Sequence, residues 1–159
     1  MRNILAAVFA STVIQIPLAY ILFSRESLVL GQGFLDFSNE QQLLILGFVL
    51  FVALSFILCV GLPAFFLLKK LKRNSLFYLT TIGAVVPIAF LLLMELSTDT
   101  RAGFSSGENY YGTYRAMVEN GLRTKWGVIK YTEEMVVYSI HGFFSALVFF
   151  KIANRGVDA

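Results

Sequence analysis

The sequence predicts an all-α membrane protein, a bundle of four transmembrane helices forming a single domain over residues 1–159. Hydrophobic residues make up 57% of the chain and charged residues only 14%, against roughly 25% charged residues in an average soluble domain. The 16 Phe residues are more than the core of a soluble domain of this size needs. The chain also contains four long apolar segments, each close to the roughly 20 helical residues that cross a bilayer core of ~30 Å.

The four predicted spans differ in how clearly they are bounded. In chain order they cover residues 4–23, 43–68, 76–95 and 133–151. The first two contain no charged residue, and Glu95 ends the third. The fourth is the most polar, because it begins with Glu133 and Glu134 and ends with Lys151. An apolar run after Arg2 also resembles a secretory signal peptide, but a run of about 20 residues exceeds the usual roughly 7–15, so we expect an uncleaved first helix.

Local signals mark the start of one span and irregular points in others. Ser38 followed by Gln41 is the pattern of a capping box, which predicts that the second helix opens there. Pro17, Pro63 and Pro87 lie one in each of the first three spans, and proline is the usual cause of kinks in membrane helices. We expect the clearest kink at the Gly61-Leu62-Pro63 step.

The distribution of Lys and Arg predicts that both termini are cytoplasmic. The turn between the second and third spans carries Lys69, Lys70, Lys72 and Arg73 and no acidic residue. Further basic residues precede the first span and follow the fourth, whereas the connection 24–41 is mainly acidic. The connection 97–131 also holds five basic residues, but they are spread over a longer stretch and mixed with acidic ones. The excess of basic charge on cytoplasmic loops therefore places 24–41 and 97–131 outside.

The longer outer loop, 97–131, is predicted to contain a short interfacial helix. Its first part is rich in turn-forming and polar residues, and apolar residues then recur among charges from Tyr114 to Lys130. These apolar positions fit a helical stripe in part, with interruptions at Gly121 and Gly127. Tyr and Trp favour the headgroup level of a bilayer, so we expect one or two short helices on the outer membrane surface.

A line of polar residues on the fourth span is the most suggestive feature of the sequence. Glu134, Tyr138, His141 and Ser145 follow one another at steps of four, three and four, which places them on one helix face. Because His141 lies about 10 Å beyond Glu134 along a helix, it is deep in the predicted span. Such a line either conducts protons or ions, or it bonds neighbouring helices together. The second interpretation is favoured because no span carries a carboxylate at mid-depth.

The first span offers a matching stripe of small and polar residues. Its members recur every four residues and are Ala7, Ser11, Gln15 and Ala19. Small residues at this spacing allow close helix contact, and Gln15 lies at a depth similar to that of His141. We therefore predict that the first and fourth spans are neighbours, with Ser11 and Gln15 facing His141 and Ser145. Thr80 or Thr81 of the third span is an alternative partner for His141, and Gly142 and Ala146 allow another helix to approach closely.

Several classes of chemistry lack the residues they require. The single Cys59 excludes an internal disulfide, and we expect it to be buried in a packing role. One Cys and one His do not make a structural zinc site, and a haem would need a second axial ligand beside His141. No phosphate loop, metalloprotease motif or paired nucleophile and base is present. We expect no cofactor, metal or catalytic residue, and no binding of nucleic acid, since the basic residues form no patch on a soluble fold.

The sequence predicts a non-enzymatic protein of a bacterial inner membrane that acts by binding partner proteins. Small accessory subunits and immunity-type proteins have this size and predicted topology, although architecture alone supports the analogy. The partner would be another membrane protein or a second copy of the chain, in addition to the lipid bilayer. The alternative is a small transporter or channel subunit that uses the polar face of the fourth helix. A membrane enzyme is the least supported possibility.

Overall fold

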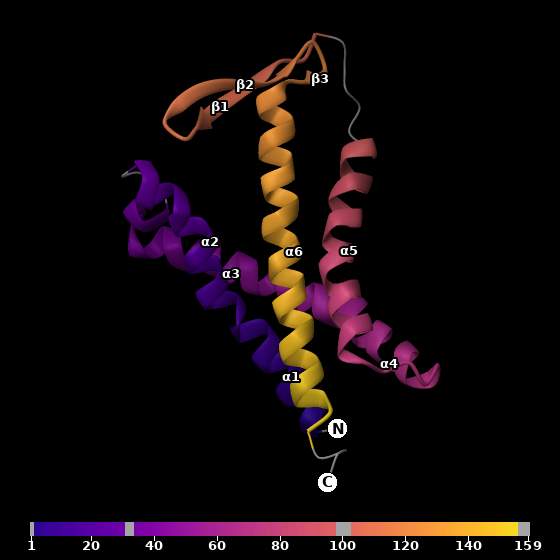
Figure 1. The fold of residues 1–159 in the computed structure, drawn as a ribbon. Helices are drawn as coiled ribbons and strands as arrows, with labels where there is room; N and C mark the ends of the chain where they lie inside the picture. The colour runs from indigo at the N-terminus through magenta and orange to yellow at the C-terminus, as the bar shows by residue number, and fades with distance from the viewer. Residues whose placement is uncertain (1, 31–33, 98–102, 156–159) are drawn as a thin grey trace.

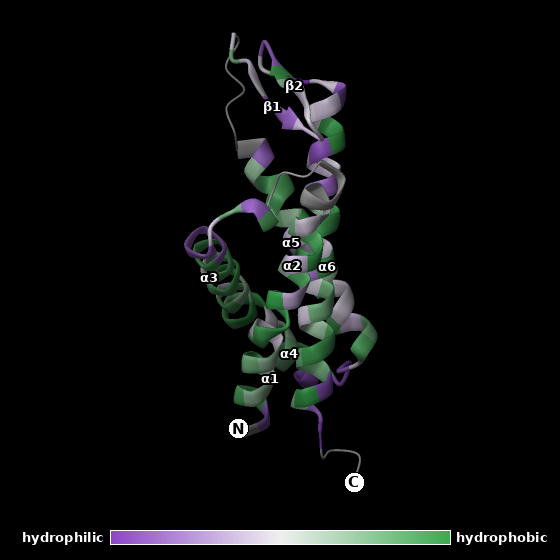
Figure 2. Ribbon diagram, turned by 90° about the vertical axis from the view of Figure 1, so that its left-hand side faces the viewer, coloured by the Kyte–Doolittle hydropathy of each residue, from purple (hydrophilic) through white to green (hydrophobic). Residues whose placement is uncertain are grey.

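The computed structural model describes residues 2–30, 34–97 and 103–155 and consists mainly of helices (Figure 1). The helices are α1 (Arg2–Val13), α2 (Gln15–Leu30), the 3₁₀ turn η1 (Phe34–Asp36), α3 (Asn39–Phe56), the π-helix η2 (Ile57–Gly61), α4 (Leu62–Lys70), α5 (Leu76–Ser97) and α6 (Lys125–Ala153). Within the residues that the structure describes, four helical stretches are long and apolar enough to cross a membrane, namely Asn3–Ser24, Asn39–Lys70, Leu76–Glu95 and Lys125–Ala153. Apolar residues run along these helices, and hydrophilic residues gather near the chain ends and in the strands (Figure 2).

Two of the three prolines coincide with a local change in helix geometry. Proline has no N–H, so Pro17 leaves the Val13 carbonyl without its helical partner. The helix is interrupted by a turn at Ile14, between α1 and α2. Pro63 does the same to the Cys59 carbonyl, and the π-helix η2 directly precedes this proline. The π-helix thus lies directly beside the Gly61-Leu62-Pro63 step, where a kink was predicted, and the kink itself stays a prediction. Pro87 remains inside the continuous helix α5.

The capping box predicted at the start of the second helical stretch is confirmed. The Ser38 hydroxyl accepts a hydrogen bond from the Gln41 backbone N–H at 3.3 Å, and the Gln41 side chain accepts one from the Ser38 N–H at 3.1 Å. Before it, α2 extends to Leu30, beyond the predicted end of the first span, and η1 follows. Phe34 of η1 is buried against Ala19 and Leu46, so the first connection folds back onto the helices.

A three-stranded antiparallel sheet replaces the helix predicted in the longer outer loop. Its strands, in the order in which they pair, are β1 (Ser106–Tyr110), β2 (Thr113–Glu119) and β3 (Leu122–Arg123). The predicted interfacial helix is thus wrong from Tyr114 to Arg123. The reason is local, because Tyr111-Gly112 and Asn120-Gly121 adopt φ values of 47°, 77°, 50° and 81°. Two consecutive left-handed residues form the two-residue turns that join antiparallel strands, and they cannot continue a helix.

The sheet is attached directly to the beginning of α6, which starts at Lys125, ahead of the predicted fourth span. Thr124 caps this helix through its hydroxyl, which accepts a hydrogen bond from the Gly127 N–H at 3.2 Å. The same residue donates to β2 twice, from its N–H to the Met117 carbonyl at 2.9 Å and from its hydroxyl to the Ala116 carbonyl at 2.6 Å. A Cβ at Gly127 would collide with the Met117 carbonyl, so glycine permits this close approach.

The helices are held together at the end of the molecule opposite the sheet. Both chain ends and the turn between α4 and α5 lie there (Figure 1). The Asn3 side-chain amide donates to the Arg155 carbonyl at 2.8 Å, and the Asn74 amide donates to the Asn154 side chain at 3.1 Å. From this end α3 leans away from α5 and α6 (Figures 1 and 2).

Cys59 lies on the outside of the helices and not in their interior. Its side chain is exposed, which contradicts the prediction that it is buried. Many large apolar side chains of the four stretches are exposed in the same way, among them Leu44 at 74% and Phe77 at 72%. Outward apolar surface of this kind is what a membrane helix presents to lipid, and a small cysteine is compatible with it.

Candidate functional site in the helix bundle

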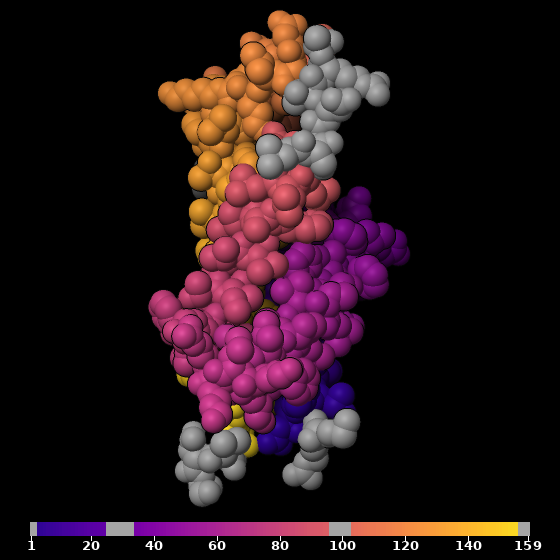
Figure 3. All heavy atoms as spheres, turned by 90° about the vertical axis from the view of Figure 1, so that its right-hand side faces the viewer, coloured from indigo at the N-terminus to yellow at the C-terminus, as the bar shows by residue number. Residues whose placement is uncertain are grey.

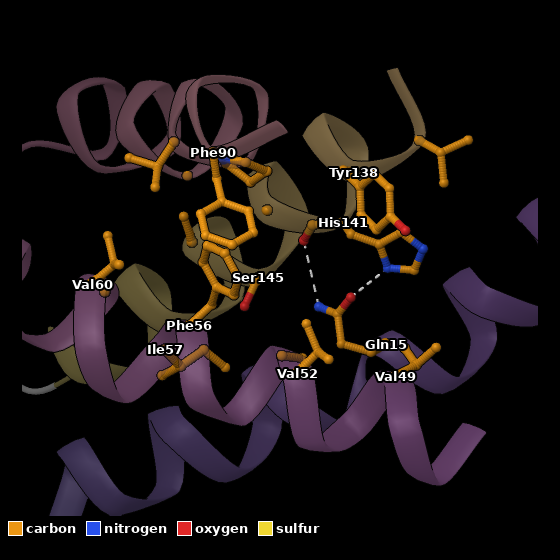
Figure 4. Close-up of a pocket in the computed structure, with 18 of the residues that line it drawn as sticks. Gln15, Val49, Val52, Phe56, Ile57, Val60, Phe90, Tyr138, His141 and Ser145 are labelled. Carbon is orange, nitrogen blue, oxygen red and sulfur yellow. Dashed lines mark hydrogen bonds between the residues drawn. The ribbon is translucent and has the colours of Figure 1, made fainter. Parts of the chain in front are cut away.

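Gln15 and His141 form a hydrogen-bonded pair between the first and fourth helical stretches (Figure 4). The His141 ring nitrogen Nδ1 lies 2.5 Å from the Gln15 side-chain oxygen. The Gln15 amide nitrogen donates to the His141 carbonyl at 3.4 Å and to the Ser11 carbonyl at 3.2 Å. An amide oxygen only accepts hydrogen bonds, so the pair requires the proton on Nδ1. The contact predicted between these residues is confirmed.

The rest of the predicted stripe on the first stretch also faces inward. Ala7, Ser11, Gln15 and Ala19 are exposed by 0%, 0%, 1% and 0%. The Ser145 hydroxyl donates to the Ser11 carbonyl at 3.4 Å, so a second polar contact joins α1 and α6. The Ser11 hydroxyl is buried and has no hydrogen-bond partner among the described residues. Thr80, the suggested alternative partner of His141, instead donates to the Leu76 and Phe77 carbonyls of its own helix.

Glu134 and Tyr138 share the helix face of His141 by spacing, but they do not extend its hydrogen bonds. The Glu134 carboxylate lies 4.0 Å from the Lys130 ammonium, one turn toward the sheet. Tyr138 is 47% exposed and lies between Glu134 and His141 along α6. The structure thus brings together Ser11, Gln15, His141 and Ser145 and leaves Glu134 at a different level. Whether this face has a function beyond packing stays a prediction.

A cavity of about 500 Å³, called the deep cavity below, lies between α3, α5 and α6. Its walls are almost entirely apolar and include Val52 and Phe56 of α3 and Val86 and Phe90 of α5. Its polar lining residues are Gln15, Tyr138, His141 and Ser145. Figure 4 shows these side chains converging on the cavity, and Figure 3 shows the face of the molecule on which α5 and α3 border it.

A second cavity of about 350 Å³, called the shallow cavity, adjoins the deep one between α2, η1 and α6. The two share four lining residues, Phe23, Ile45, Val137 and Tyr138. The shallow cavity differs in chemistry because Lys130, Glu133 and Glu134 also line it. The two cavities lie side by side, and the lining changes from charged to apolar across the residues that they share.

The close packing of α5 on α6 depends on Gly142 and on Gly83, and the sequence did not single out Gly83. A Cβ on Gly142 would collide with the Gly83 carbonyl oxygen and lie 3.1 Å from the Pro87 ring. A Cβ on Gly83 would lie 2.7 Å from the Ala146 Cβ. Because Pro87 has no N–H, the Gly83 carbonyl lacks its usual helical partner, and the Gly142 backbone approaches it. The Gly142-xxx-Ala146 spacing was a usable signal, whereas Gly83 stands alone in an apolar run.

Arg123 joins three elements at the sheet-bearing end and was also not singled out from the sequence. Its guanidinium forms a two-pronged ion pair with the Glu95 carboxylate at the end of α5. It also lies 4.4 Å from the ring centroid of Tyr131 on α6. The hydrogen bond to Glu95 raises the pKa of Arg123 above its ordinary value. This contact fixes α5, β3 and α6 relative to one another.

Further aromatic and charged residues of the sheet also contact the first turns of α6. Arg115 of β2 stacks on the Trp126 ring at 4.4 Å, and the Tyr110 ring lies 5.9 Å from it. Lys130 and Glu108 form an ion pair, and the Tyr111 hydroxyl donates to Glu133 at 3.4 Å. The sheet is therefore held at several points along the first turns of α6.

Neither the chemistry of metal binding nor similarity to known proteins assigns this site. Within residues 2–30, 34–97 and 103–155, no group of three or more His, Cys, Asp or Glu side chains lies close enough together to hold a metal ion. Comparison of the chain with protein-family models, with curated proteins and with solved structures gave no match in any of the three.

Proposed function

We propose that this chain is a non-enzymatic, multi-pass protein of a bacterial inner membrane, with both termini in the cytoplasm, that acts by binding a partner protein. The outward apolar surface of four long helical stretches supports the membrane location. The basic turn between α4 and α5 lies at the same end as both termini, which supports the orientation (Figure 1). An accessory subunit or immunity-type protein fits this description.

The sheet-bearing end carries the proposal of partner binding. At 1.5 Å per residue, the 29 residues of α6 are ~44 Å long, more than a bilayer core of ~30 Å, so its first turns project and hold the sheet in water. On this projecting part Tyr114 and Leu122 are exposed by 74% and 75%. A contiguous apolar patch exposed to water is typical of protein interfaces, and we propose that these two side chains form part of one. The partner is therefore a protein that offers an apolar surface to these residues.

Purification of the tagged protein from its own source at native abundance tests the proposal. We expect a second polypeptide in a 1:1 ratio, and an affinity for it reduced about tenfold or more in Tyr114→Ser combined with Leu122→Ser. Thr113→Ser is the matched control, because this neighbouring exposed residue of β2 keeps its hydroxyl. Absence of a stoichiometric partner, or equal affinity in the double variant, would contradict the proposal.

A transporter or channel subunit is the second candidate, because Tyr138, His141 and Ser145 of α6 line the deep cavity. Two observations argue against transport. The Gln15 amide is already hydrogen-bonded to the His141 carbonyl and Nδ1, and Glu134 lies nearer the sheet, beside Lys130. An ion-flux assay in liposomes comparing wild type with His141→Gln separates the two functions. We expect equal flux; loss of flux in a folded variant would favour the transporter, since an amide cannot take up a proton near neutral pH as imidazole can.

A further inference from the structure

The two adjoining cavities have opposite chemistry, and together they have the character of a site for an amphiphile. The deep cavity is within the range of small-molecule sites, roughly 300–1,000 Å³, and its lining is mostly aliphatic and aromatic. Two of its four polar side chains are bonded already, Gln15 to His141 Nδ1 and Ser145 to Ser11, so among the described residues only the Tyr138 hydroxyl and His141 Nε2 remain for an occupant. Water there would find few of the two to four partners that a buried water needs, so an alkyl chain is the better occupant.

The shallow cavity provides charges of both signs beside this apolar space. The Lys130 ammonium and the Glu134 carboxylate line it at 4.0 Å from each other, and Glu133 lines it as well. Lys130 pairs more closely with Glu108 than with Glu134, but an ammonium has three donors and can contact a further acceptor. Because Glu133 and Glu134 both line the cavity, its lining carries more negative than positive charge, which favours a headgroup with a cationic group over a purely anionic one. Neighbouring positive and negative side chains complement a headgroup in which an anion and a cation are also neighbours.

We infer that the two adjoining cavities join beside Tyr138 and together bind one phospholipid with a zwitterionic, amine-bearing headgroup. Its phosphate lies at Lys130, its ammonium group at Glu134, and one acyl chain passes Tyr138 into the deep cavity. Because the cavity lining comes from α3, α5 and α6, the acyl chain fills the space between helices that do not close on each other. This site is independent of the partner-binding surface, which is on the sheet.

The acyl-chain part of the site is tested by filling the deep cavity from one wall. Val86 lines the cavity, whereas the adjacent Val85 is 52% exposed on the outside of α5, so Val86→Trp and Val85→Trp form a matched pair. Native mass spectrometry of delipidated protein incubated with equal amounts of phosphatidylethanolamine and phosphatidylglycerol measures the bound fraction. We expect a 1:1 phosphatidylethanolamine adduct in wild type and Val85→Trp, and about tenfold less in Val86→Trp.

A second pair from the opposite wall covers the case in which Val86→Trp does not fold. Val52 of α3 lines the deep cavity, and Leu44 of the same helix is exposed by 74% and lines neither cavity. Val52→Trp should lose the adduct and Leu44→Trp should keep it. An adduct that persists in a folded Val86→Trp or Val52→Trp variant overturns the inference. Co-purification of a polypeptide whose binding these variants abolish also overturns it, because the cavity would then bind that polypeptide and not a lipid.

The headgroup part is tested by removing one charge. Glu134→Gln should abolish the preference for phosphatidylethanolamine over phosphatidylglycerol while an adduct remains, because the acyl chain still binds. Glu119→Gln is the control, since this exposed glutamate of β2 lines neither cavity. Equal binding of the two lipids by the wild type, or an unchanged preference in Glu134→Gln, contradicts the zwitterionic assignment. These measurements need no partner protein, so their failure is distinguishable from failure of the proposed function.

Discussion

At the scale of single residues, the side chain of Gln15 joins the first helical stretch of the chain to α6, the last one. Its amide nitrogen donates to the Ser11 carbonyl of α1 and to the His141 carbonyl of α6, and its amide oxygen accepts from the His141 ring. In an apolar environment a polar side chain is stable only when such partners are present. This explains why a glutamine can be 1% exposed among apolar helices.

Replacing His141 measures the contribution of this contact. We expect His141→Leu to lower the free energy of unfolding by ~0.6–2 kcal/mol, the range for a hydrogen bond buried in a membrane. His141→Gln should preserve most of the stability, because its amide can still donate to the Gln15 oxygen. Unfolding of the purified protein by increasing detergent strength gives both values.

A double-mutant cycle with Gln15→Leu serves as the control for this prediction. If the two side chains interact as described, the combined loss is smaller than the sum of the single losses, because the second change removes a partner already lost. Additive losses would contradict a direct interaction between Gln15 and His141.

The sequence predicted this residue pair but not the close contact at Gly83. A repeat of four residues in the first span gave the buried stripe, and depth in the bilayer matched Gln15 with His141. Gly83 matters because Pro87 leaves its carbonyl unbonded and Gly142 lies opposite it in space. Only knowledge of how α5 and α6 pair provides that second fact, so periodicity within one helix could not reveal it.

At the scale of helices and strands, the crossing of α5 and α6 depends on two glycines that face each other. Substitution of a glycine by alanine tests whether the missing side chain is required for close contact between two helices. In Gly142→Ala the added methyl collides with the Gly83 carbonyl, so we expect a loss of about 1–3 kcal/mol in unfolding free energy, as for overpacked cores. Thermal or detergent unfolding measures this loss.

Gly47 of α3 is the matched control, because no described atom beyond its sequence neighbours and its own helix backbone lies within 4 Å of where its Cβ would be. Gly47→Ala should leave stability unchanged or raise it slightly, since alanine favours helices over glycine by up to about 1 kcal/mol. Equal stability of Gly142→Ala and wild type would show that the two helix backbones are further apart than described here.

The sheet shows where the reading of elements from sequence failed and why. Asn120-Gly121 is a strong hairpin signal, and alternation of side chains between Thr113 and Glu119 is compatible with a strand. The apolar residues nearby also fit a helical stripe in part, so the helical pattern competes with the hairpin signal and predicts the wrong element here. The prediction that Cys59 is buried was wrong for another reason. A lipid-facing surface is as apolar as a packed interior, so composition does not distinguish the two.

At the scale of the whole molecule, the arrangement predicts which ends are accessible from which side of a membrane. Single cysteines at Ser75, in the turn between α4 and α5, and at Ser106, at the start of β1, are placed in a Cys59→Ser background. An impermeant thiol reagent on intact cells should label the cysteine at position 106 and not the one at position 75.

Permeabilised cells provide the control, since both positions should then react. Labelling of position 75 alone on intact cells would reverse the proposed orientation. Labelling of both positions on intact cells would contradict the four-span arrangement itself.

The contact of the first helical stretch (α1 and α2) with α6 has a consequence for the order in which the protein is made. A ribosome releases the first helical stretch long before the last, at roughly 5–20 residues per second. Until α6 emerges, Ser11 and Gln15 lack Ser145 and His141 as partners. In the proposed membrane location, the first three stretches therefore carry an incomplete polar stripe until α6 has been made, so the last helix completes the hydrogen bonds of the first.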